Sequence, residues 1–160
     1  MDASKLSRGE LIGIVAGLIL VGSLFLQWYS LDTGGVDRDE DADWVCGVGD
    51  NSCTGFETFP ILRWLLIAAA AAPVILSYIV VRGHNLSWPR GELTAIVGLT
   101  AFVLIAYNGF IDKPSPNDIG VNLSYGYFIA LVASLGIFIS GGFRSVESGG
   151  GAQRKPPATF

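Results

Sequence analysis

Four long apolar stretches constrain the fold of this chain more than any other feature of its sequence. They occupy residues 11–29, 61–81, 93–111 and 125–143. Each stretch has 19 to 21 residues, about the number that a helix needs to cross a hydrocarbon core of roughly 30 Å. Arg63 is the only charged residue inside any of them. The pattern therefore predicts an all-α membrane protein, a bundle of four transmembrane helices.

The composition supports this fold class. Only 15% of the residues are charged and the mean hydropathy is +0.51, whereas soluble domains average about 25% charged residues. We expect one transmembrane domain over residues 1–143. After Arg144 the chain is rich in glycine, serine and proline, which predicts a disordered cytoplasmic tail over residues 144–160.

The distribution of charge predicts which way the bundle faces. Four spans place both termini on one side, together with seven of the ten bases but only four of the fourteen acids. Positive residues favour the cytoplasmic side of a membrane. We therefore expect a multi-pass protein of the plasma membrane, with cytoplasmic termini and an extracytoplasmic loop over residues 30–60.

This outer loop holds eight of the acids and both cysteines of the chain. Cys46 and Cys53 are close in sequence, and pairing them predicts a disulfide bond in an oxidising compartment. Closing so short a loop stabilises it by roughly 2–3 kcal/mol. A short β-hairpin could form within the loop from Trp44, Val45, Val48 and Phe56.

The acids of the loop alternate as they do at the start of a calcium-binding loop: Asp37, Asp39, Asp41 and Asp43. The comparison then fails, because Ala42 replaces the required glycine and Val48 replaces the bidentate glutamate. A solvated acidic surface is the expected role, with weak calcium binding as the alternative. The candidate interaction residues are Trp28, Trp44, Arg63, Asp39, Asp41 and Asp43.

Local signals within the spans predict how the helices begin and pack. Ser7 and Glu10 have the spacing of a capping box, which starts a helix near Arg8. Gly13 and Gly17 form a GxxxG pair that permits close helix approach. For Arg63 we expect the side chain to reach lipid headgroups or a loop acid, with a ligand or ion contact as the alternative.

A short motif recurs along the chain. Arg8-Gly9-Glu10-Leu11 returns as Arg90-Gly91-Glu92-Leu93, an offset of 82 residues. One interpretation is a duplicated helical hairpin. The other is convergent interface chemistry, with arginine facing headgroups and glutamate at a helix start.

Motifs of catalysis and cofactor binding are missing from the sequence. It has no glycine-rich phosphate loop, nucleophile elbow or helix of metal ligands, so we expect no enzyme, no cofactor and no catalytic or metal site. The acidic loop disfavours nucleic acid as a partner. The middle of each span lacks the ionisable relay that proton-coupled carriers need.

The loop arrangement resembles that of the claudin-like tetraspan proteins. The resemblance rests on Trp28, Trp44, Cys46 and Cys53. It implies a disulfide-stapled β-sheet that packs on the bundle and makes lateral or trans contacts.

A second resemblance covers more of the chain. The start Arg8-Gly9-Glu10-Leu11, the run from Leu24 to Tyr29 and the entry from Gly55 to Phe59 are similar to small uncharacterised four-helix membrane proteins of actinobacteria. That family carries no known activity to transfer.

Together these observations predict a non-enzymatic accessory or scaffolding subunit. Its partners would be the lipid bilayer and other membrane or extracellular proteins, met through the outer loop and the helix faces. A small channel or carrier formed as a homo-oligomer is the alternative.

Overall fold

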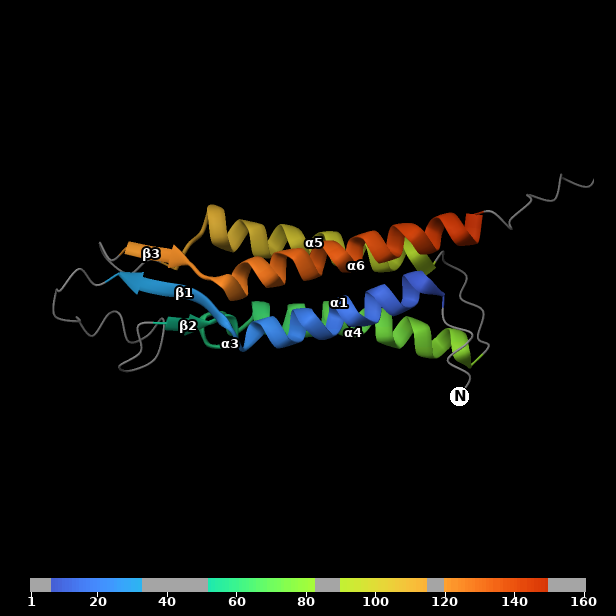
Figure 1. Cartoon of the computed structure of the whole chain (residues 1–160), viewed down its shortest axis with the longest axis horizontal. Coiled ribbons are helices and arrows are strands. Elements are labelled where there is room, and N and C mark those ends of the chain that lie inside the picture. The colour runs from blue at the N-terminus through green and yellow to red at the C-terminus, as the bar shows by residue number, and fades with distance from the viewer. Residues whose placement is uncertain (1–6, 33–51, 83–89, 115–119, 150–160) are drawn as a thin grey trace, which may run out of the picture.

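The computed structural model describes residues 7–32, 52–82, 90–114 and 120–149. Its elements in chain order are α1 (Arg8–Leu24), β1 (Gln27–Asp32), β2 (Ser52–Thr54), α3 (Gly55–Thr58), α4 (Leu62–Val81), α5 (Arg90–Phe110), β3 (Gly120–Leu123) and α6 (Tyr125–Gly149) (Figure 1). The four long helices run side by side, and the three strands lie together beyond one end of the bundle (Figure 1). We call this the sheet end and the other end the Arg144 end.

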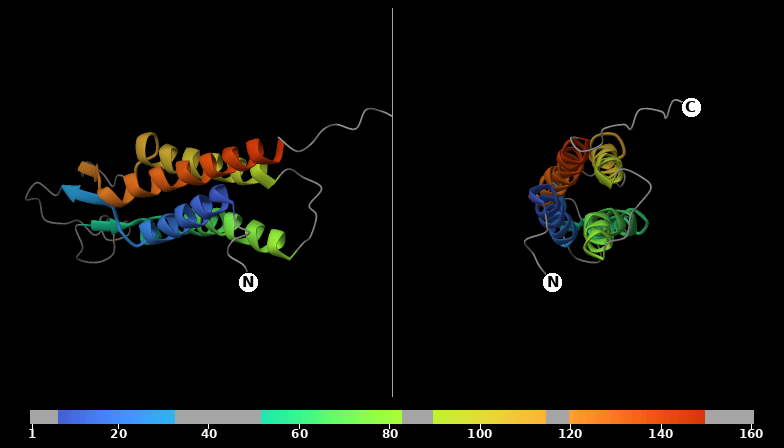
Figure 2. Two further views of the ribbon diagram at one scale, coloured as in Figure 1. Left: turned by 45° about the vertical axis from the view of Figure 1, so that its right-hand side comes forward. Right: turned by 90° about the vertical axis from the view of Figure 1, so that its right-hand side faces the viewer.

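Helix α6 makes the most extensive contacts in the bundle. It packs against α5 and α1, and α1 also packs against α4, whereas α4 and α5 make the least extensive contacts among the four neighbouring pairs of long helices. Figure 2 shows this ring of helices in end view. The helix order around the ring is therefore α4, α1, α6, α5, with a loose seam between α5 and α4.

Three of these helices are long and apolar enough to cross a membrane. Among the described residues, the qualifying stretches are Leu62–Ile79, Gly91–Phe110 and Tyr125–Val146. The first predicted span, residues 11–29, does not qualify: the helix that it forms, α1, has 17 residues and a length of about 25 Å. The apolar run at residues 11–29 is divided: α1 ends at Leu24, and Trp28 and Tyr29 belong to strand β1.

The strands form one antiparallel sheet in the order β2-β1-β3. Tyr29 pairs with Cys53 on one side and with Leu123 on the other, so β1 is the central strand. The sheet therefore joins the two segments that flank residues 33–51 to the segment directly before α6, and it is not a hairpin within one loop. Phe56, which we expected in a hairpin, lies instead in the short helix α3, whose capping box is formed by Thr54 and Glu57. Trp44, Val45 and Val48 lie outside the described residues.

Helix α6 continues to Gly149, beyond the predicted end of the fourth span at residue 143. Tertiary contacts explain the extension. Arg144 is held by an ion pair with Glu10 of α1, and Gly141 packs directly on the backbone of Ala95 in α5. The last residues of the predicted tail, 150–160, lie outside the described part of the chain.

Glycines allow the helices of the bundle to approach closely. A Cβ atom on Gly17 would lie 2.5 Å from the carbonyl oxygen of Ala70 in α4. A Cβ on Gly13 would lie 2.8 Å from the hydroxyl oxygen of Ser140 in α6 and 3.2 Å from Cβ of Pro73 in α4. The GxxxG pair of α1 thus lies at close helix contacts, as its spacing predicts.

Replacing Gly17 by alanine should therefore destabilise the bundle. The added methyl group meets backbone, which cannot yield as a flexible side chain can, and overpacking of this kind costs about 1–3 kcal/mol. Gly22 of the same helix is the matched control, because nothing lies within 4 Å of its added Cβ. In thermal melts of the detergent-solubilised protein, Gly17→Ala should lower Tm, and Gly22→Ala should leave Tm unchanged or raise it. Equal effects would contradict the close contact between α1 and α4.

Candidate functional site

The candidate interaction residues predicted from sequence are only partly within the described structure. Trp28 lies in β1 and Arg63 in the first turn of α4. The others, Trp44, Asp39, Asp41 and Asp43, lie outside the described residues, as does Cys46. Cys53 is fully buried in β2, and there is no free cysteine in the part that the structure describes. The predicted bridge from Cys46 to Cys53 stays a prediction.

Trp28 is a core residue of the sheet end. Its side chain is fully buried and its indole N–H donates to the carbonyl oxygen of Ser23 at 2.7 Å. Its ring centroid lies 5.9 Å from that of Tyr127 and 6.3 Å from that of Phe59. A Cβ on Gly55 would collide with the indole. A partner therefore cannot reach Trp28, and its role is to hold α1, β1, α3 and α6 together.

Tyr29 completes this aromatic cluster from the neighbouring position. Its hydroxyl group donates to the carbonyl oxygen of Asn108 in α5 at 3.1 Å, and its ring lies 6.0 Å from that of Phe59. Burial raises the pKa of the Tyr29 phenol well above its ordinary value of about 10. The sequence placed Trp28 and Tyr29 at the end of a predicted span, but it did not indicate that they contact α1, α3, α5 and α6.

Arg63 is fixed on the surface of the sheet end. One terminal nitrogen, Nη1, donates to the carbonyl oxygen of Phe56 at 3.2 Å. The guanidinium carbon lies 4.6 Å from the ring centroid of Phe56 and 5.6 Å from that of Trp64, both within the range of cation–π attraction. Phe56 also stacks on Phe25 at 5.2 Å. These rings, with Arg63, form one continuous cluster, which we call the Arg63 ledge: Phe25, Phe56, Arg63 and Trp64.

The Arg144 end contains a buried ion pair that the sequence did not indicate. Nη2 of Arg144 lies 3.1 Å from Oε1 of Glu10, and the two side chains are only 6% and 9% exposed. Glu10 also accepts from the backbone N–H of Ser7 at 3.0 Å, so the predicted capping box is confirmed. Thr94 of α5 lies beside Arg144 at 3.5 Å. The pair therefore connects α1, α5 and α6, across 134 positions of sequence.

The repeated Arg-Gly-Glu-Leu motif lies on the two sides of α6 at this same end. A Cβ on Gly9 would contact the side chain of Arg144, and one on Gly91 would collide with the backbone of Ser145. The two glutamates differ, because Glu10 is buried and Glu92 is exposed. A duplication of the hairpin stays a prediction, but both copies of the motif bring a helix close to α6.

Two apolar grooves follow the sides of the bundle. The larger, of about 600 Å³, lies between α1 and α6, with Ala16, Ala133 and Gly136 among its lining residues and Leu11 and Phe128 toward its two ends. The smaller, of about 360 Å³, follows the seam between α4 and α5 and includes Ala69 and Thr100. The described residues contain no group of three histidine, cysteine or acidic side chains arranged to hold a metal ion.

Removing one member of the buried ion pair should destabilise the protein strongly. Glu10→Gln or Arg144→Gln leaves the other charge buried, which costs about 3–5 kcal/mol, whereas the exchanged pair Glu10→Arg with Arg144→Glu should recover part of the loss. Glu92→Gln is the matched control, since this glutamate occupies the equivalent position of the repeated motif but is exposed. Thermal melts in detergent provide the measurement. If the Glu92 variant were as unstable as the Glu10 variant, the loss of stability could not be assigned to the buried ion pair.

Replacing Tyr29 by phenylalanine should have two separable effects. The lost hydrogen bond to Asn108 should lower stability by about 1 kcal/mol at neutral pH. A tyrosine whose pKa is raised by folding contributes stability that is complete below about pH 10 and is lost as the pH rises above that value, by up to about 1.4 kcal/mol per pH unit. The variant should therefore show a shallower fall of Tm above pH ~10. Tyr125→Phe, at a residue that is 54% exposed, is the control and should leave the stability at neutral pH unchanged.

Comparisons of the chain with family models, with curated proteins and with solved structures find no match. The resemblances to claudin-like and actinobacterial four-helix proteins therefore stay predictions, and the function has to be argued from the residues of this chain.

Proposed function

We propose that this chain is a non-enzymatic, multi-pass accessory or scaffolding subunit of a membrane protein complex. In this proposal it contacts other membrane or extracellular proteins through its sheet-end loop and its helix faces. The proposal rests on one contrast: polar side chains inside the bundle form hydrogen bonds within it, whereas the exterior of the bundle is apolar.

The polar side chains of the helices bond to their own backbone. Hydroxyl groups of Ser23, Ser77 and Ser140 each donate to a carbonyl oxygen three or four residues earlier, and Thr100 and Asn108 do the same. Each of these groups thus uses a donor within its own helix. The exposed surface of α1 and α6 carries large apolar side chains, such as Leu18 and Val132 at 65% and 67% exposure.

The groove between α1 and α6 is the helix face that best suits a partner helix. Its small residues, Ala16, Ala133 and Gly136, permit close backbone approach, which is the feature that drives helix association in lipid. Arg63 and the sheet-end loop provide a second, polar region for contacts outside the hydrocarbon core.

The proposed topology follows from charge and length. Helix α1 is taken as a fourth span that ends at Leu24, with both termini in the cytoplasm and the sheet end, including Trp28 and Tyr29 of β1, outside. The disulfide between Cys46 and Cys53 would then form in an oxidising compartment and anchor the loop to strand β2.

A small oligomeric channel or carrier is the second candidate, and the loose seam between α4 and α5 is the observation that favours it. This seam holds a groove that includes the polar residue Thr100, so several copies joined along it could enclose a pathway. The Thr100 hydroxyl group already donates to the carbonyl oxygen of Ile96 at 2.8 Å, which makes this candidate the weaker of the two.

Mild extraction from the native membrane, followed by native mass spectrometry, should recover this chain with a second protein at fixed stoichiometry. Val132→Trp would fill the groove between α1 and α6 and should reduce recovery of the partner by roughly fivefold or more, the equivalent of about 1 kcal/mol. Val103→Trp is the matched control, because Val103 is also exposed, at 54%, but lies on α5 away from that groove.

The alternatives give different results in the same experiment. A complex that survives Val132→Trp would place the contact on the loop or on another helix face. Recovery of a pure homo-oligomer would contradict the accessory-subunit function, and ion flux through reconstituted vesicles would then test the channel.

A further inference from the structure

We propose that the Arg63 ledge binds the phosphate group of an anionic phospholipid at the sheet end of the bundle. The proposal does not depend on the accessory-subunit function, nor on which side of the membrane the sheet end faces. It rests on three features: the contacts that fix Arg63, the absence of a balancing carboxylate and of enough hydrogen-bond acceptors among the described residues, and the apolar surface around it.

Protein contacts fix the position of the Arg63 guanidinium. It donates from Nη1 to the carbonyl oxygen of Phe56 at 3.2 Å and lies over the Phe56 ring at 4.6 Å. An arginine that only reaches for water extends away from the protein and needs no such contacts. The cation is instead held in place before a ligand arrives, which reduces the entropy lost on binding.

The charge of Arg63 is not balanced by the described residues. The one ion pair among them joins Arg144 to Glu10 at the far end of the bundle, and Arg63 meets no carboxylate. Glu57, the nearest acid in sequence, bonds to the hydroxyl and backbone of Thr54. Arginine is costly near lipid unless it is paired, so a bound anion would balance a charge that no carboxylate of the described residues balances.

The hydrogen-bonding capacity of the guanidinium is also largely unused. Arginine carries five N–H donors, and one carbonyl oxygen accepts from Arg63. Its Nε atom is buried and has no acceptor within the described structure. Phosphate oxygens are strong acceptors that match the planar fork of arginine, so a phosphate beside the guanidinium would accept from the terminal N–H groups that remain unused.

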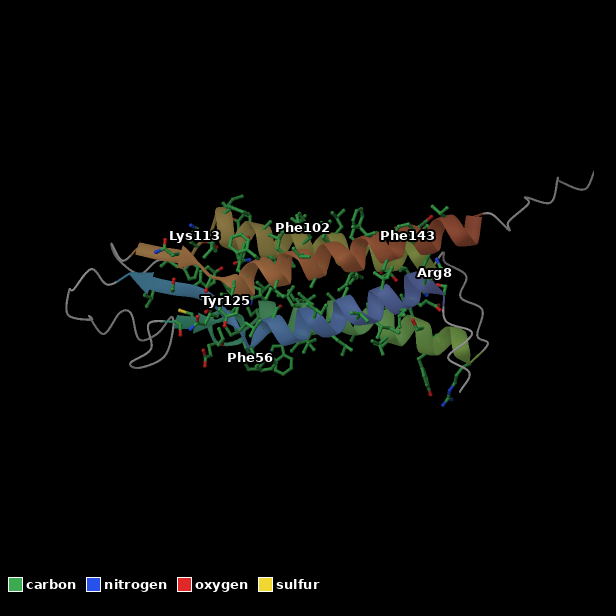
Figure 3. The ribbon with its side chains drawn as sticks, in the orientation of Figure 1. Arg8, Phe56, Phe102, Lys113, Tyr125 and Phe143 are labelled. Atoms are coloured by element: carbon green, nitrogen blue, oxygen red, sulfur yellow. The ribbon has the colours of Figure 1, made fainter. Side chains whose placement is uncertain are left out.

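The surroundings favour a lipid phosphate over a free phosphate ion. Ile61, Trp64 and Phe25 are 75%, 60% and 60% exposed and flank Arg63 in sequence or through Phe56. Aromatic and aliphatic side chains in such positions are typical of a membrane boundary, and they offer contacts to glycerol and acyl chains that a free ion cannot use. Phe56 projects from the sheet end of the bundle, opposite the end that carries Arg8 and Phe143 (Figure 3).

The test uses the full-length protein in phosphatidylcholine vesicles with and without phosphatidylglycerol. Native mass spectrometry after detergent transfer counts the phosphatidylglycerol molecules that the protein retains. Arg63→Gln should reduce retention about fivefold, the equivalent of roughly 1 kcal/mol for one arginine at a lipid surface. Phosphatidylglycerol should also raise Tm of the wild-type protein but not of the variant.

Arg82→Gln is the matched control. Arg82 also lies over an aromatic ring, at 4.8 Å from Tyr78, but it is exposed and lies at the Arg144 end of α4. The variant removes the same charge and should retain phosphatidylglycerol as the wild type does. An equal loss in both variants would show a net-charge effect, and no loss in Arg63→Gln would show that the ledge does not bind lipid; either result overturns the proposal.

Two further measurements complete the test: a lysine variant and a competition with inorganic phosphate. If Arg63→Gln reduces the yield of folded protein, Arg63→Lys replaces it, and full retention by the lysine variant would overturn a site built on the arginine fork. Inorganic phosphate is added to the wild-type protein as a competitor. Loss of the bound lipid at a phosphate concentration equal to that of the phosphatidylglycerol would assign the site to a free anion and overturn the lipid.

Discussion

Close backbone contact around α6 is the constraint on which the rest of this structure depends. In lipid, apolar side chains gain little from contact with each other, so helix association depends on packing and on internal hydrogen bonds. Here Gly91 and Gly98 of α5, Gly9 and Gly13 of α1 and Gly141 of α6 remove the side chains that would keep the helices apart. Where such glycines are missing, between α4 and α5, the bundle stays loose and a groove remains.

The two ends of the bundle are fixed by different chemistry. At the sheet end, Trp28, Tyr29 and Tyr127 pack ring against ring, and their polar atoms bond to backbone carbonyl oxygens. At the Arg144 end, a buried ion pair connects α1 to α6. A buried ion pair is weak evidence for net stability but strongly favours one arrangement of its partners. The two ends thus specify which helices are neighbours, and the apolar middle is left free for lipid or for another helix.

This division bears directly on the proposed function. A carrier keeps polar or ionisable groups facing a pathway in the middle of its spans, whereas the described helices turn theirs to their own carbonyl oxygens. In our proposals, recognition falls to the exterior: the groove between α1 and α6, and the Arg63 ledge. This is why we propose a scaffolding role in preference to transport.

The sequence by itself determined that the chain is mostly helical, where three helices long and apolar enough to cross a membrane lie, and where the first helix starts, at Ser7, because hydropathy and capping depend on neighbouring residues alone. Only the tertiary structure decided the sheet, the end of α1 and the roles of Trp28 and Arg144. Strand pairing of Tyr29 with Cys53 and Leu123 overrides the apolar run that would otherwise continue the helix. In the sequence, Glu10 and Arg144 each look like an ordinary charge at the end of a span. Only packing brings Nη2 of Arg144 to 3.1 Å from Oε1 of Glu10. Contacts between residues so distant in sequence leave no local pattern, since their energy arises only once the helices are assembled.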